Sequence, residues 1–246
     1  MKKVIMMALG VLALVGCGKS APETKSVGTT ERDTINGVPC VVYMPYEVES
    51  RKSKVERYPV LYLQHGMWGN EDDWTAKGNL VGIMDSLLQA EVVPEMVVIM
   101  PDNCPGKPTY QEELANATTG AWEAQFAAFI AEAERKYPIS DKPSQRAIAG
   151  LSMGGYHTMM VSSLLDGQFG YVGMFSAATF VHQMPSEPAL LWTAIGKDDF
   201  LYASFTEYRR WLESEHREYT YYESAGGHDW PNWQDYIARF LPLCFK

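Results

Sequence analysis

The sequence predicts an α/β protein with a mostly parallel central sheet and helices on both faces of that sheet. Short β-rich runs alternate with helical stretches along residues 34–246, as they do where crossover helices join parallel strands. The central runs are continuously apolar, as strands covered on both faces tend to be. With 246 residues, 46% of them hydrophobic and 21% charged, the chain can bury a core and is too apolar to be disordered.

The expected elements follow from local pattern. Strands are predicted at 38–43, 59–64, 96–100, 145–149, 171–175, 190–195 and 218–223. Helices are predicted at 79–90, 120–136, 154–165, 203–216 and 231–241. In the second helix Trp122, Phe126 and Phe129 recur at helical spacing and are expected to face the core. Ligands of open α/β sheets bind beyond the carboxyl ends of the strands, so the loops there are expected to surround one site.

The N-terminus predicts a lipoprotein signal. Lys2 and Lys3 precede an uncharged, mostly apolar stretch over 4–15, a pattern that is typical of secretory signals and too short to span a bilayer. The stretch ends in LVGC at 14–17, which looks like a bacterial lipobox in which Cys17 is lipidated and becomes the first mature residue. An ordinary signal peptide, with Cys17 there by accident, is the alternative.

We therefore expect residues 1–16 to be removed, 17–33 to form a flexible tether and 34–246 to fold as one domain. A lipid on Cys17 would anchor the exported protein to a membrane, facing the periplasm or at the outer membrane or cell surface. The net charge of −9 and the lack of a dense basic run argue against a nucleic-acid partner. The oligomeric state is not readable from the sequence.

The remaining cysteines are Cys40, Cys104 and Cys244. Three thiols allow at most one disulfide, and the sequence does not pair them. Their alternative role is that of buried small hydrophobic residues. The cysteines are also too few and too scattered for a zinc ribbon, and no metal site is expected.

Residues 150–154 read Gly-Leu-Ser-Met-Gly between a predicted strand and a predicted helix. This is the pattern of the nucleophile elbow of α/β-hydrolases. The sharp turn holds Ser152 in a strained conformation with its Oγ clear of the backbone, and glycine is needed two positions to either side because larger side chains would collide. The first free N–H groups of the next helix point to the same place, where an oxyanion can form. Ser152 is therefore the predicted nucleophile.

A serine nucleophile needs a base, and the base needs an orienting carboxylate, in the chain order serine, acid, histidine. His228 is the predicted base because it follows the last strand in a glycine-rich loop that can place its ring freely. Asp198 and Asp199 both follow the strand that ends at Gly196, and position alone does not separate them. His157 lies inside the helix after the elbow and is expected to pack.

A second donor for the oxyanion is expected from another strand end. Residues 64–66 end a strand and open the loop at 67–74. The backbone N–H groups of Met67 and Met153 are the predicted oxyanion donors. His65 is expected to orient this loop rather than to act as a base.

Four ordered motifs resemble the esterase D-like family of α/β-hydrolases: HGMWGNEDDW at 65–74, RAIAGLSMGGY at 146–156, GKDD at 196–199 and GGHDWPNW at 226–233. The family includes feruloyl esterases, acetyl xylan esterases of carbohydrate esterase family one, S-formylglutathione hydrolases, enterochelin esterase-like enzymes and mycolyltransferases. The resemblance covers roughly residues 34–243. It implies Asp199 over Asp198, since the family acid is the last residue of a Gly-x-x-Asp pattern. It also implies that neither a metal nor an organic cofactor takes part.

The resemblance and the predicted export favour a serine carboxylesterase that acts on acetyl or feruloyl esters of plant polysaccharide. Trp68 and Trp230 are expected to stack a sugar or an aryl group. Asp102 and Asn103 are expected to hydrogen-bond a hydroxylated substrate, and His182 to lie in a pocket wall. Three alternatives stay open: a siderophore-ester hydrolase, a sugar acyltransferase, and a non-catalytic lipid-anchored glycan-binding protein on the same fold.

Overall fold

The computed structural model describes residues 28–45, 56–104 and 109–246. The predicted signal peptide, Cys17 and the tether up to residue 27 lie outside the described residues, so these expectations stay predictions. No helix in the described part of the chain has both the length and the apolar character needed to cross a membrane.

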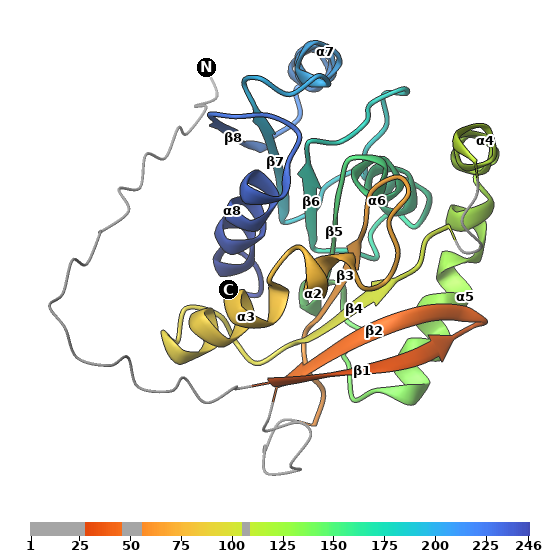
Figure 1. Ribbon diagram of the computed structural model, residues 1–246, viewed down its shortest axis with the longest axis vertical. Helices are drawn as coiled ribbons and strands as arrows, with labels where there is room; N and C mark the ends of the chain where they lie inside the picture. The colour runs from red at the N-terminus through yellow and green to blue at the C-terminus, as the bar shows by residue number, and fades with distance from the viewer. Residues whose placement is uncertain (1–27, 46–55, 105–108) are drawn as a thin grey trace, which may run out of the picture.

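The described residues form one eight-stranded sheet in the order β1-β2-β4-β3-β5-β6-β7-β8 (Figure 1). The strands are β1 (Gly28–Ile35), β2 (Val38–Pro45), β3 (Val60–Gln64), β4 (Val97–Pro101), β5 (Arg146–Leu151), β6 (Tyr171–Phe175), β7 (Leu190–Gly196) and β8 (Thr220–Ser224). β2 pairs antiparallel with both β1 and β4, and every other neighbouring pair is parallel. This is the mostly parallel sheet that the sequence predicted, and all seven expected strands are present.

Helices cover both faces of the sheet, as predicted (Figure 1). They are α2 (Asp73–Ala76), α3 (Leu80–Gln89), α4 (Tyr110–Thr119), α5 (Ala121–Lys136), α6 (Met153–Leu164), α7 (Tyr202–Ser214) and α8 (Trp230–Phe240). Phe126 of α5, Tyr156 of α6 and Phe205 of α7 belong to one buried cluster. Met84 of α3 and Tyr236 of α8 belong to a second cluster against the opposite face. The short α2 and the polar α4 were not expected from the sequence.

The tether expected over residues 17–33 is wrong for 28–33, because these residues belong to β1. The strand pairs with β2 along its whole length, from Gly28 opposite Pro45 to Ile35 opposite Val38. Most of its side chains are partly or fully exposed, so an apolar pattern does not mark it. Backbone pairing with β2 rather than an apolar pattern defines this strand, and residues 28–33 belong to the folded domain.

Cys40, Cys104 and Cys244 are buried free thiols, so none of the possible disulfides among them forms. Burial raises the pKa of the Cys40 thiol to about 12. The three therefore fill the alternative role, that of small buried hydrophobic residues.

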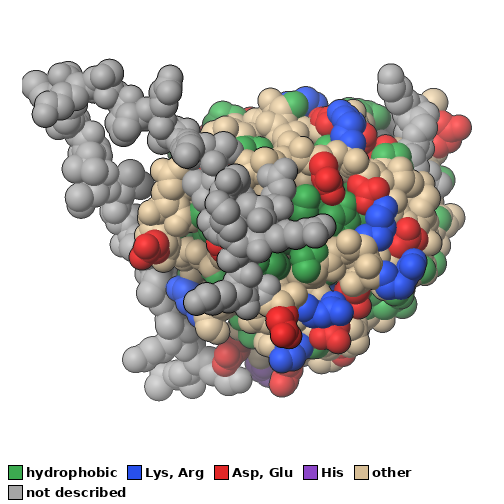
Figure 2. All heavy atoms as spheres, turned by 90° about the horizontal axis from the view of Figure 1, so that it is seen from below, with side chains coloured by type: hydrophobic (Ala, Val, Ile, Leu, Met, Phe, Trp, Pro, Cys, Tyr) green, Lys and Arg blue, Asp and Glu red, His purple; other side chains and the backbone are tan. Residues whose placement is uncertain are grey.

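Charged side chains of both signs are visible on the face that is seen from below the view of Figure 1. Figure 2 shows lysine and arginine side chains interspersed with aspartate and glutamate on this face.

Candidate active site

The turn between β5 and α6 has the strained geometry of a nucleophile elbow. Ser152 has a φ of 55° and a ψ of −118°, a conformation that costs free energy outside glycine. Its N–H donates to the Phe175 carbonyl oxygen at 2.9 Å, and its own carbonyl accepts from the Ala178 N–H at 3.0 Å. A Cβ at Gly150 would lie 2.4 Å from the Gly154 carbonyl oxygen, so the turn admits only glycine there. The predicted elbow is present.

The loop after β3 lies directly against this elbow. A Cβ at Gly154 would lie 2.2 Å from the His65 carbonyl oxygen, and one at Gly66 would lie 3.2 Å from the Ser152 Cβ. Met67 follows Gly66, and Met153 is the first residue of α6. Both predicted oxyanion donors therefore belong to backbone next to Ser152, while their role as donors stays a prediction.

Three loops at the carboxyl ends of β5, β7 and β8 bring the predicted serine, acid and histidine together. The His228 Nε2 lies 2.9 Å from the Ser152 Oγ. The His228 Nδ1 lies 2.9 Å from the Asp199 Oδ2 and 3.1 Å from its Oδ1. These distances join all three side chains in one hydrogen-bonded chain, which is the geometry needed for a base to activate a hydroxyl.

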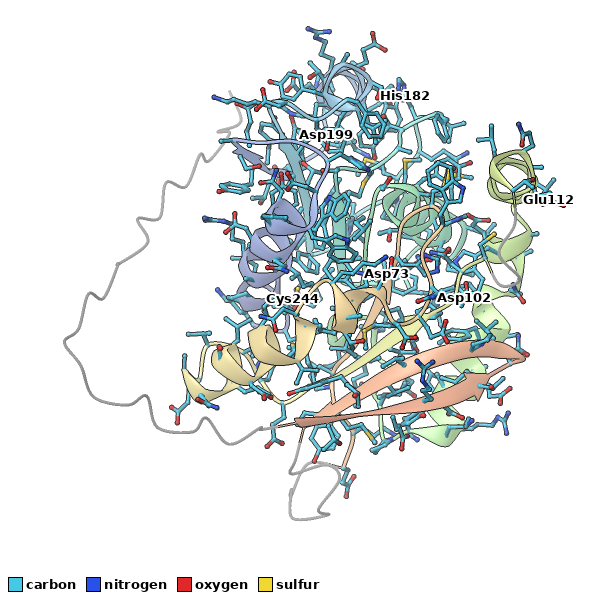
Figure 3. The ribbon with its side chains drawn as sticks, viewed as in Figure 1. Asp73, Asp102, Glu112, His182, Asp199 and Cys244 are labelled. Atoms are coloured by element: carbon cyan, nitrogen blue, oxygen red, sulfur yellow. The ribbon has the colours of Figure 1, made fainter. Side chains whose placement is uncertain are left out.

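The structure also separates the two candidate acids. The Asp199 side chain is fully buried, whereas Asp198 is exposed. Burial tends to raise the pKa of Asp199, but the hydrogen bond from His228 and that from the Leu201 N–H at 2.8 Å outweigh it and hold the pKa below its usual value. Asp199, labelled in Figure 3, is therefore ionised where its carboxylate meets the His228 imidazole.

Aromatic side chains pack around the histidine. The Trp233 ring meets the His228 ring edge-on, with centroids 4.9 Å apart and planes at 90°. Trp230 packs against Trp233 at 5.1 Å and against Trp74 at 5.4 Å. Trp230 is half-buried in this cluster, so its first role is to hold the loop of His228. Trp68, in the loop after β3, is 70% exposed and has a φ of 60°.

Asp102 and Asn103 belong to an internal framework around His65 rather than to an open binding surface. The Asn103 N–H donates to the His65 Nε2 at 3.1 Å, and its side-chain amide donates to the His65 carbonyl oxygen at 3.0 Å. Asp102 accepts from the Cys104 N–H at 3.0 Å. All of these residues are buried. The structure thus supports the loop-orienting role predicted for His65 and gives no support to the substrate contacts predicted for its two neighbours.

His182 lies in the segment between β6 and β7, and its side chain packs against α7 (Figure 3). Its ring packs against those of Tyr208 at 5.8 Å and Trp211 at 5.4 Å. A hollow of about 470 Å³ opens beside it. The lining residues are Ser163, Gln183, Met184, Trp211, Glu215 and Arg217. The ring contacts of His182 are thus with α7, and its predicted place in a pocket wall at the serine stays a prediction.

Two features at and near the site were not anticipated. Phe200 is 76% exposed, and its ring lies 4.5 Å from the His228 ring. Phe200 directly follows Asp199, so its position in the sequence could have predicted that it lies near the catalytic histidine. His157, expected to pack, does so as half of a buried pair in which its Nδ1 lies 2.6 Å from the Glu123 Oε1.

Comparison with known proteins decides the family. Residues 36–219 match the model of a family described as "Putative esterase". The chain belongs to this esterase family. The esterase D-like resemblance seen in the motifs is thereby confirmed at the level of the family.

Among curated relatives, an endo-1,4-beta-xylanase/feruloyl esterase of Xylanibacter ruminicola is 32% identical over 149 residues, which cover 60% of this chain and 20% of that protein. An acetyl esterase of Caldicellulosiruptor saccharolyticus is 24% identical over 230 residues, covering 75% of this chain and 82% of that one. The chain thus spans only about a fifth of the Xylanibacter protein.

A solved structure shows the same fold. The CE1 ferulic acid esterase of the anaerobic fungus Anaeromyces mucronatus superimposes with a TM-score of 0.79 at 20% identity, over 92% of this chain and 94% of that one. The fold is the α/β-hydrolase fold that the elbow predicted.

Proposed function

We propose that this protein is a serine carboxylesterase that hydrolyses acyl esters on carbohydrate through an acyl-enzyme on Ser152. The observation that carries the proposal is the continuous hydrogen-bonded chain from the Ser152 Oγ through His228 to Asp199. It is set on a strained elbow whose serine is held by backbone hydrogen bonds. Membership of an esterase family supports the same chemistry.

The mechanism follows from the geometry. His228 Nε2 takes the Ser152 proton while Oγ attacks the ester carbonyl, and the N–H groups of Met67 and Met153 hold the oxyanion. His228 then gives that proton to the leaving alcohol, and an acyl-enzyme remains. Water repeats the sequence and releases the acid. Asp199, ionised and bound to Nδ1, keeps the imidazole in the tautomer that presents Nε2 as the acceptor.

The acyl group that we propose is feruloyl or acetyl, and the alcohol is a plant polysaccharide. The names of the relatives support this choice, since one is a xylanase/feruloyl esterase and another an acetyl esterase. The exposed ring of Phe200 beside His228, and the exposed Trp68 in the loop after β3, suit a flat acyl group or a sugar face. We further propose export with a lipid anchor at Cys17, which would give the enzyme access to a polymer outside the cell.

The test is hydrolysis by the purified full chain, with Ser152→Ala as the control. We expect ferulate release from methyl ferulate or acetate release from acetylated xylan, and background rates with the variant. A catecholate siderophore ester completes the panel. Exclusive cleavage of that ester would replace the carbohydrate assignment, and equal rates with Ser152→Ala would remove the nucleophile. Ester formation with an added sugar alcohol would show acyl transfer instead of hydrolysis.

A further inference from the structure

We propose that Phe200 recognises the alcohol half of the ester by stacking against the sugar ring that carries the scissile oxygen. The inference rests on the proposed carbohydrate esterase function and assigns one half of its substrate to one side chain. It starts from the exposure of this residue. Phe200, at 76%, is the most exposed large hydrophobic side chain among the described residues.

The contact with the base makes this exposure informative. A scattered apolar side chain at a surface needs no explanation. The Phe200 ring, however, lies 4.5 Å from the His228 ring at an interplanar angle of 51°. One part of the phenyl ring is therefore fixed on the catalytic histidine, and the rest is open to a ligand that reaches the same imidazole.

The backbone that carries Phe200 is held on both sides. The Asp199 N–H donates to the Gly196 carbonyl oxygen at 3.1 Å, and the Tyr202 N–H donates to the Asp199 carbonyl oxygen at 2.9 Å. The Leu201 N–H donates to the Asp199 carboxylate at 2.8 Å. An aromatic ring on such a turn loses little conformational freedom when it binds, which favours affinity.

The orientation of His228 shows which half of the ester Phe200 meets. The Nδ1 edge of the imidazole faces the buried Asp199, and the buried Trp233 packs edge-on against the ring. The Nε2 edge faces the Ser152 Oγ. Since Nε2 protonates the leaving oxygen, the alcohol has to lie beside the His228 ring.

The carbonyl oxygen of the ester, which becomes the oxyanion, lies on another side of the serine, towards Met67 and Met153 if these supply the oxyanion donors. Phe200 therefore borders the alcohol and not the carbonyl oxygen. Binding sites commonly combine apolar ring faces, which contact the ligand, with a few polar groups that orient it, and a sugar alcohol would be bound here in that way.

The experiment compares alcohols at a constant acyl group. We would measure kcat/KM for feruloyl arabinose against methyl ferulate, and for an acetylated xyloside against methyl acetate. Phe200→Ala should lower the preference for the sugar ester roughly tenfold in each series, which is the effect expected for loss of one aromatic contact of about 1.4 kcal/mol. Phe200→Tyr, which keeps the ring, should restore the preference. Leu164→Ala removes another exposed apolar side chain, at the end of α6, and should leave it unchanged.

Several results would overturn the inference. Equal losses for sugar and methyl esters would mean that Phe200 acts only by positioning His228. A loss that follows the acyl group would place Phe200 on the other half of the substrate, and an unchanged kcat/KM for every ester would remove the contact. A changed deacylation rate of the common feruloyl-enzyme, measured after the alcohol has left, would also contradict it.

Failure of the proposed function gives a different result. If the wild type hydrolyses acetyl but not feruloyl esters, the feruloyl assignment falls while the alcohol preference is still read in the acetyl series. A wild type that cleaves methyl esters without preferring the sugar ester in either series overturns the inference on Phe200 and leaves the esterase chemistry standing.

Discussion

Two histidine–aspartate pairs lie at the same edge of the sheet, and their environments differ in the way that matters for catalysis. The His228 Nδ1 lies 2.9 Å from Asp199, and the imidazole side chain is 15% exposed. The His65 Nε2 lies 3.4 Å from Asp102, and that imidazole is 1% exposed. Both pairs follow strand ends in loops, so proximity of a carboxylate to a histidine does not by itself mark a base.

The second nitrogen of each ring separates the pairs. The His65 Nδ1 faces the Gly66 carbonyl oxygen at 2.7 Å, and its Nε2 accepts from the Asn103 N–H. Backbone groups thus lie within hydrogen-bond distance of both nitrogens of this ring. The His228 Nε2 instead meets a serine hydroxyl. A base is recognised by what its free nitrogen can reach.

Replacing each of the two histidines by glutamine should give the largest difference between the two pairs. His228→Gln should lower kcat by a factor of about 10⁴ or more, because the serine loses its proton acceptor, and should leave the free energy of unfolding nearly unchanged. His65→Gln should lower that free energy by about 1–3 kcal/mol, because buried backbone groups lose a partner, and lower kcat less than about tenfold. Ester hydrolysis and urea unfolding measure the two effects. Equal kcat losses in the two variants would erase the distinction.

The paired carboxylates extend the same test. Asp199→Asn should lower kcat by roughly 10⁴-fold, because an amide no longer fixes the tautomer of His228. Asp102→Asn keeps the oxygen that accepts from the Cys104 N–H, so kcat should fall less than about tenfold. Steady-state kinetics on one chromogenic ester compares them. A larger loss in the Asp102 variant contradicts the assignment of the acid.

The third histidine–carboxylate pair shows what a purely structural pair does. Glu123 and His157 are each 3% exposed and join α5 to α6. Glu123→Ala should therefore destabilise the fold by about 3 kcal/mol, because it leaves a buried polar group unpaired. Glu132→Ala on the same helix removes only a surface contact with Arg135 at 3.9 Å and should cost about 0–1 kcal/mol. Chemical denaturation measures the free energy of unfolding of both variants. Similar losses of that free energy would contradict the difference expected between the buried pair and the surface pair.

The smallest expected effect is the pH dependence of stability at Asp199. Its pKa is lower in the folded state than in the unfolded chain, so the ionised form favours folding. That stabilisation is complete above the ordinary carboxyl pKa of about 3.9 and is lost as the pH falls through the lowered folded-state value. The stability gap between wild type and Asp199→Asn should therefore narrow below about pH 4. Urea unfolding between about pH 3 and 7 measures it, and a gap that widens on acidification contradicts the shift.

The sequence predicted those parts that hydrophobic pattern and turn chemistry determine. β2 to β7 are mostly apolar runs and β8 carries two adjacent tyrosines, while Gly150 and Gly154 mark the elbow because no Cβ fits there. The serine, the histidine and the two candidate acids followed from chain order at strand ends. β1 was not predicted from the sequence, because backbone pairing rather than apolar side chains defines it.

The direction of a side chain within a loop was not predictable in the same way. Asp102 and Asn103 follow β4 at the expected edge but turn inward to His65. His182 turns to the aromatic rings of α7. Phe200, one residue after the acid, turns outward beside the base. These directions depend on contacts between distant segments, which local pattern does not contain.

Labelling of the full chain with a fluorophosphonate tests the central claim most directly, because it reads activation of the serine without assuming a substrate. We expect one phosphonyl group on Ser152 in the wild type and in His65→Gln, located by mass spectrometry of peptides. His228→Gln should be labelled at least about 10³-fold more slowly. Labelling of His228→Gln at the wild-type rate, or a label on a residue other than Ser152, would contradict the account.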